Sequence, residues 1–160
     1  PLFWFPTSAA YLLGLQHLSL NWLAVLEFLF FLFPLNFYLY GLNDLYDTKS
    51  DRVNPRKGGA QGARISNSEA TLLKKIVFIP PILFMLLSAL SFSLEHIALS
   101  AIFVFLCFAY SHSSIRLKEK PFLDSATAAL GYALPAFIAY SLHDSIRTVS
   151  MQYFFLLFPH

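Results

Sequence analysis

Charge is what this chain has least of. Only 12% of its 160 residues are charged and 57% are hydrophobic, whereas a soluble domain usually carries about 25% charged residues. This composition excludes an ordinary soluble domain and indicates a protein whose partner is the lipid bilayer; we expect no nucleic-acid partner. Cysteine is equally scarce: Cys107 stands alone, which excludes a disulfide framework and a Cys-rich metal site. We expect Cys107 to be a small buried side chain.

Long apolar runs take the place of charge. A helix needs about 20 residues to cross a bilayer, and the alternation typical of an outer-membrane barrel is absent. We therefore predict an all-α, multi-pass transmembrane helical bundle with five full spans and part of a sixth. Pro80 and Pro81 should lie in the first turn of the third span or kink it. The runs are Leu2–Leu20, Trp22–Asn43, Ile76–Leu94, Ile97–Ser111, Phe122–Leu142 and a last one from Val149.

The few basic residues are unevenly distributed. Ten of the eleven fall in two polar segments, Asp44–Lys75 and His112–Pro121, which alternating spans place on one side of the membrane. By the positive-inside rule that side is the cytoplasm, so we predict a cell-membrane protein with both basic loops facing inward. Glu27 is expected near the opposite interface and receives no role. The five histidines form no ligand spacing and are expected at interfaces or in the core.

The most informative motif is N-D-x-x-D-x-x-x-D, from Asn43 to Asp51, at the end of the second span. On a helix its acids fall on one face, continuous with polar residues inside the membrane. Three carboxylates on one face repel each other unless a cation lies between them, and an all-oxygen set favours Mg²⁺ or Ca²⁺ over zinc. The alternative is a solvated helix end. The predicted metal ligands and catalytic residues are Asp44, Asp47 and Asp51.

Basic residues lie close to this motif in the predicted topology. Arg56 and Lys57, followed by two glycines, could hold phosphate oxygens beside a metal. Arg116 and Lys118 in the second basic loop face the same side. The alternative is that these charges only set topology. No Walker-type phosphate loop is present.

Two stretches resemble the UbiA superfamily of intramembrane prenyltransferases: Gly41-Leu42-Asn43-Asp44-Leu45-Tyr46-Asp47 through Asp51, and Tyr110-Ser111 through Arg116-Leu117-Lys118. The resemblance implies a bundle of about nine spans that transfers a prenyl group from a prenyl diphosphate to a hydrophobic acceptor. It implies that the acids and Asn43 bind Mg²⁺ and diphosphate. It also implies that the diphosphate is held by Lys57, Tyr110, Arg116 and Lys118.

Finer details resemble the lycopene elongase-like branch, whose members extend carotenoid ends: Phe33-Pro34-Leu35-Asn36, Asn54-Pro55-Arg56-Lys57-Gly58 and Lys120-Pro121-Phe122-Leu123-Asp124. The family's second motif, D-x-x-x-D after the sixth span, does not occur. The chain also begins without Met and ends two residues after the apolar run Phe154–Phe158. We therefore expect residues 1–160 to be the N-terminal part of one UbiA-type domain, incomplete at both ends.

Three other functions stay open. The acceptor could be an aromatic compound in quinone or related lipid biosynthesis instead of a carotenoid such as lycopene. A phosphatidyl-group transferase of the CDP-alcohol type would need D-G-x-x-A-R ahead of its acids, a string that is absent. A cation-binding transporter is a remoter possibility, because transport sites tend to lie near the membrane midplane and these acids lie at the end of a span.

Overall fold

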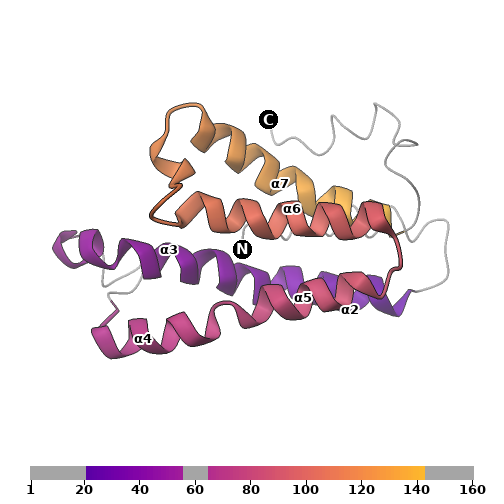
Figure 1. The fold of residues 1–160 in the computed structure, drawn as a ribbon, viewed down its shortest axis with the longest axis horizontal. Helices are drawn as coiled ribbons and strands as arrows, with labels where there is room; N and C mark the ends of the chain where they lie inside the picture. Colours follow the sequence, from indigo (N-terminus) through magenta and orange to yellow (C-terminus); the bar gives the residue numbers. More distant parts are fainter. Residues whose placement is uncertain (1–20, 56–64, 143–160) are drawn as a thin grey trace.

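The computed structural model describes residues 21–55 and 65–142, apart from the side chains of residues 49, 50 and 52, and its regular elements in this part are all helices (Figure 1). No strand occurs in these two ranges, so the predicted all-α bundle is confirmed for them. The first and sixth predicted spans lie outside them. The elements are α2 (Trp22–Leu32), α3 (Pro34–Val53), α4 (Asn67–Ile76), α5 (Ile79–Ala89), α6 (Leu94–Ser111), the 3₁₀ turn η1 (Leu117–Glu119) and α7 (Leu123–Ser141).

The second predicted span is two helices joined at a break. Pro34 has no N–H to continue the hydrogen bonding of α2, and its ring would clash with a carbonyl of the preceding turn. The side-chain amide of Asn36 donates instead to the carbonyls of Phe31 (2.6 Å) and Leu32 (3.3 Å). Asn36 is therefore held by the break in the helix, and the apolar unit Trp22–Thr48 remains long enough to cross a membrane.

The segment predicted to be a long polar connection, Asp44–Lys75, is helical at both of its ends. α3 continues to Val53, and α4 begins at Asn67, so the third span does not start at Ile76 as predicted. Ser66 and Glu69 form a capping box: the Ser66 hydroxyl accepts from the Glu69 N–H, and the Glu69 carboxylate accepts from the Ser66 N–H. Pro80 and Pro81 lie in the first turn of α5, as predicted.

The centre of the bundle is a cluster of aromatic rings. Phe31 of α2 lies edge-on to Phe84 of α5, with centroids 5.3 Å apart, and to Phe103 of α6, at 5.4 Å. All three are essentially inaccessible to solvent. Edge-to-face pairs of this kind contribute about 0.5–1.5 kcal/mol each beyond the burial of their area, so this cluster ties three helices together. Cys107 lies in the same core, as predicted.

Next to the aromatic cluster lies a buried polar network. The Glu27 carboxylate pairs with His96 Nε2 at 2.8 Å and accepts from the Ser88 hydroxyl at 3.2 Å. His96 Nδ1 lies 2.9 Å from the Ser141 hydroxyl, and Ser88 also bonds to Ser100. Since the network joins α2, α5, α6 and α7, Glu27 has the structural role that the sequence did not reveal. His96 is a core residue, as expected.

The described parts of the two polar segments, Asp44–Lys75 and His112–Pro121, lie at one end of the bundle (Figure 1). The C-terminal end of α3, the N-terminal end of α4 and η1 lie together on the left of Figure 1, and the start of α2 and the α5–α6 turn lie on the right. The two basic segments are therefore neighbours, as predicted. Trp22–Thr48, Asn67–Ala89 and Leu94–Ser111 are long and apolar enough to cross a membrane. α7 occupies the fifth predicted span but is not among these three.

Candidate active site

The acidic motif lies on the last three turns of α3. Its residues Asn43, Asp44 and Asp47 are half-buried, and Asp51 is buried. Thr48 lies between the acids, and its hydroxyl donates to the carbonyl of Asp44 at 2.9 Å, so it does not compete for a ligand at the surface. The predicted helical placement of the motif is therefore confirmed.

The second basic loop folds back over this end of α3. It leaves α6 at His112, whose ring lies against Phe108 and Tyr46 with centroids 4.3 and 4.9 Å away. Arg116 follows in the left-handed conformation, with φ 43° and ψ 59°, and its N–H donates to the His112 carbonyl. A non-glycine residue there costs about 1–2 kcal/mol, and such strain is common at ligand clamps. The turn directs Arg116 and Lys118 back toward the acids.

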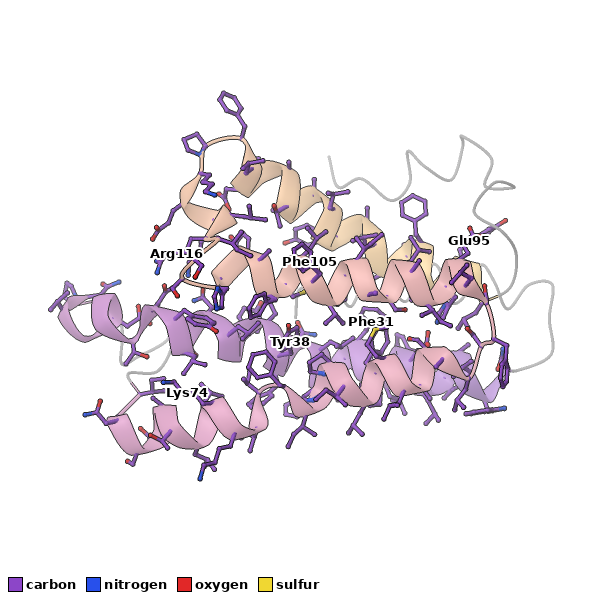
Figure 2. All side chains as sticks on the ribbon, in the orientation of Figure 1. Phe31, Tyr38, Lys74, Glu95, Phe105 and Arg116 are labelled. Carbon is purple, nitrogen blue, oxygen red and sulfur yellow. The ribbon has the colours of Figure 1, made fainter. Side chains whose placement is uncertain are left out.

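Four of the predicted site residues form one cluster. Lys118 Nζ donates to the Asn43 side-chain oxygen at 2.8 Å and to one Asp47 oxygen at 2.5 Å. Arg116 Nη2 donates to the other Asp47 oxygen at 3.3 Å and to Glu119. The side chains of Lys118 and Asp47 are only 13% and 15% exposed, so both charges are partly desolvated and attract each other more strongly than on an open surface. Figure 2 shows Arg116 at this end of the bundle.

This arrangement changes how the acids are neutralised. The sequence suggested that they repel each other unless a metal lies between them, but each oxygen of Asp47 faces a cation from the second basic loop. The Arg116 Nε–H is buried without a hydrogen-bond partner among the described residues. The cluster therefore holds two cations close together and one spare donor, which suits it to bind an anion with several oxygens.

The described residues offer no closed metal cage. No three His, Cys, Asp or Glu side chains in this part of the chain come close enough to hold an ion together. Mg²⁺ is usually held by one or two carboxylates, with waters and substrate phosphates completing its coordination. The donor set on α3 therefore fits a magnesium ion shared with a phosphate ligand, and it does not fit a metal held by protein alone.

A cavity of about 350 Å³ lies directly beside the cluster, between α3, α6 and α7. Asn43 belongs to both the cluster and the cavity wall, and it connects the charged groups to a mostly apolar interior. Tyr110 also lines the cavity and shares a side-chain hydrogen bond with Asp124. The wall includes Tyr40 and Asn43 from α3, Phe103, Cys107 and Tyr110 from α6, and Gly131 from α7.

Comparison with known proteins identifies the family. The profile of the UbiA prenyltransferase family matches residues 3–160, almost the whole chain. The chain belongs to the UbiA prenyltransferase family. No solved structure matches it significantly.

Several curated relatives lie within one branch of the UbiA family. A protein of Corynebacterium glutamicum named lycopene elongase/hydratase is 35% identical over 158 residues, which cover 94% of this chain and 53% of the relative. One of Haloarcula japonica with the same name is 31% identical and covers 91% and 50%. The C(50) beta-cyclic carotenoids biosynthesis protein LbtBC of Dietzia is 36% identical and covers 89% and 33%. The resemblance to the elongase-like branch is thus confirmed, and the chain spans about half the length of the elongase/hydratases.

Not every predicted site residue can be placed in this UbiA family site. Arg56 and Lys57 lie outside the described residues. Phe103, Gly131 and Glu119 were not predicted. Glu119 lies between two stretches that the sequence analysis quoted and received no role there. The two cavity residues look like ordinary apolar helix positions until the helices are packed.

Proposed function

We propose that this chain is part of an intramembrane enzyme that transfers a prenyl group from a prenyl diphosphate to a lipophilic acceptor, in a reaction that depends on Mg²⁺. The observation that supports this most is the adjacency of two different environments. Lys118, Arg116 and Asp47 form a charged cluster, and Asn43 connects it to an apolar cavity. A prenyl diphosphate has the same two parts, a charged head and an apolar tail.

The basic side chains of the cluster bind the diphosphate head. Lys118 and Arg116 give up part of their contact with Asp47 to phosphate oxygens, and Arg116 Nε–H supplies a further donor. Charge-assisted hydrogen bonds to phosphate are among the stronger polar contacts in proteins. Tyr110 lines the cavity nearby, and its hydroxyl joins this set by donating to a phosphate oxygen in place of Asp124. Arg56 and Lys57 join this set on the strength of the family resemblance.

The acids of α3 complete the head-group site. Asp44, Asp47 and Asp51 would supply the protein's carboxylates for Mg²⁺, one or two of them at a time beside the diphosphate, and the bound ion would neutralise charge on the leaving group. Once Arg116 and Lys118 face the phosphates, Asp47 is available for this role. The protein groups also stabilise the charge that develops on the diphosphate as the allylic C–O bond breaks.

The cavity protects the reacting carbon from water. Its lining is mainly apolar, and the Tyr40 ring at its edge offers an aromatic face that can steady an allylic cation. The electron-rich carbon of the acceptor forms a new C–C bond to the prenyl group, and the acceptor loses a proton. The names of the relatives favour a carotenoid such as lycopene as acceptor. An aromatic compound is the alternative acceptor. A cation transporter is less well supported, because transport of a cation does not require the apolar cavity beside the acids.

The proposal extends to the whole protein. We propose that residues 1–160 form the N-terminal part of a single UbiA-type domain, incomplete at both ends, since they align with about half the length of the elongase/hydratase relatives. We also propose that the basic loops and the mouth of the active site face the cytoplasm of a cell membrane.

The test compares two lysines of the same loop in the complete protein that carries this chain. Lys118 contacts Asn43 and Asp47, whereas Lys120 is exposed. Lys118→Gln should raise the KM for a prenyl diphosphate donor and lower kcat/KM by about 10²-fold, because one charge-stabilising donor is lost. Lys120→Gln should retain the parent kinetics. Equal kinetics for the parent and Lys118→Gln, or the absence of any transfer by the parent, would contradict the proposed function.

A further inference from the structure

The cavity has a definite depth along α6. Tyr110 lines it near the charged cluster, Cys107 lies one turn further in, and Phe103 lines it one turn beyond Cys107. At a rise of about 1.5 Å per residue, the separation of seven positions from Tyr110 to Phe103 corresponds to about 10 Å. The cavity is therefore a short pocket when it is viewed from the diphosphate end.

Phe103 forms a rigid inner end to this pocket. Its side chain is fully buried, and its ring lies edge-on to Phe31, which in turn packs on Phe84. The next inward positions on the same face of α6 are Ser100 and His96, which belong to the buried polar network with Glu27. A packed aromatic layer backed by a hydrogen-bonded layer cannot move aside at low cost, because interiors of this density resist displacement.

We infer that Phe103 is a specificity-determining residue that limits the length of the prenyl group in the donor. This inference rests on the proposed function. If the diphosphate is held by Lys118 and Arg116, one end of the donor is fixed at the cluster, and the tail extends past Tyr110 and Cys107 toward Phe103. The ring of Phe103 then meets the end of the tail.

The dimensions favour a short tail. With bonds of about 1.5 Å, the extended main chain of a fifteen-carbon prenyl group is longer than the pocket, which is about 10 Å deep. A five-carbon group is much shorter than the pocket and leaves room beside it for the reacting end of the acceptor. Phe103 thus selects against the fifteen-carbon donor.

A substitution at Gly131 on α7 can make the pocket smaller, whereas shortening the side chain of Phe103 makes it longer. It lines the same cavity, and a Cβ added at this position would meet no atom within 4 Å. A larger side chain at Gly131 therefore fills cavity space without a steric conflict in the described part of the structure. Such a substitution narrows the pocket and creates no cavity in the core.

The experiment measures kcat/KM of the complete protein with five-, ten- and fifteen-carbon prenyl diphosphates. Phe103→Leu and Phe103→Ala should raise the ratio of fifteen-carbon to five-carbon transfer by about tenfold or more, since small changes in an apolar pocket produce effects of this size. Gly131→Leu should lower the ratio of ten-carbon to five-carbon transfer. Phe105→Ala, at an exposed phenylalanine of the same helix (Figure 2), should leave the donor profile unchanged.

The outcomes separate this inference from the proposed function. If the parent transfers the five-carbon group and the folded Phe103 variants keep its donor profile, the inference is wrong and the proposed function stands, whatever Gly131→Leu does. If the parent transfers none of the three groups, both are wrong. Phe103→Leu decides the matter even if Phe103→Ala fails to fold, because leucine keeps more of the apolar packing while it shortens the side chain at the end of the pocket.

Discussion

At the scale of single residues, Asp47 combines two roles in the cluster. It accepts hydrogen bonds from Lys118 and Arg116, and it is the central acid of the predicted metal-binding face. A substitution there has two separable consequences, one for stability and one for turnover. The stability effect of a change to asparagine is small, because the amide keeps an oxygen that can accept hydrogen bonds from Lys118 and Arg116.

Asp47→Asn should lower turnover of the complete protein by about 10²–10³-fold, by analogy with the removal of a single charge-stabilising group. The free energy of unfolding should fall by no more than about 1 kcal/mol. The measurement is the rate of prenyl transfer against Mg²⁺ concentration, with the unfolding midpoint recorded alongside. A parent-like rate and Mg²⁺ dependence would mean that the acidic motif is a solvated helix end.

Gly131→Ala tests the description of the cavity wall independently of catalysis. Gly in a helix interior is less favourable than Ala by roughly 0.5–1 kcal/mol, and the added Cβ meets nothing within 4 Å. We expect the free energy of unfolding to rise by about that amount. A fall in the unfolding midpoint would show that another part of the protein already occupies this space.

At the scale of elements, the helices follow from the apolar runs, but their ends and contacts follow only in part. The Pro34 break and the capping box at Ser66 have visible sequence signals, and the capping box was overlooked because the surrounding segment is polar. The pairing of Glu27 with His96 joins residues 69 positions apart. Neither residue belongs to a motif, so the contact depends on how α2 and α6 pack.

The site, too, could be predicted from the sequence only in part. The motif on α3 and the cations of the second basic loop were predictable, because their residue types suit a diphosphate and their segments share one end of the bundle. The inner end of the cavity was not predictable. Phe103 is one of 18 phenylalanines, and only the packing of α6 against Phe31 distinguishes it from the exposed Phe105.

The network that joins the elements gives a prediction about stability. Glu27→Ala removes the partner of His96 in a fully buried pair, and the loss of one member of such a pair costs about 3–5 kcal/mol. Glu27→Gln keeps hydrogen-bonding capacity and should cost clearly less. The measurement is the unfolding midpoint in detergent, with exposed Ser113→Ala as the control. A Glu27→Ala midpoint equal to the control would contradict the structural role of the network.

At the scale of the whole molecule, the orientation in the membrane can be tested directly. Ser113 lies in the second basic loop, and Phe92 is a 91% exposed residue of the α5–α6 turn at the other end of the bundle. In a Cys107→Ala background, Ser113→Cys should react with an impermeant thiol reagent from the cytoplasmic side only, and Phe92→Cys from the outside only. The reverse pattern would contradict the proposed orientation.

We propose that the complete protein prenylates a carotenoid within the membrane. The most direct measurement is an analysis of the pigments made by a lycopene-producing host that expresses it. We expect carotenoids that are longer than lycopene by added prenyl units, and unchanged lycopene when Asp47→Asn is expressed to the same level. Unchanged lycopene with the parent protein present in the membrane, together with a prenylated aromatic acid, would contradict the claim.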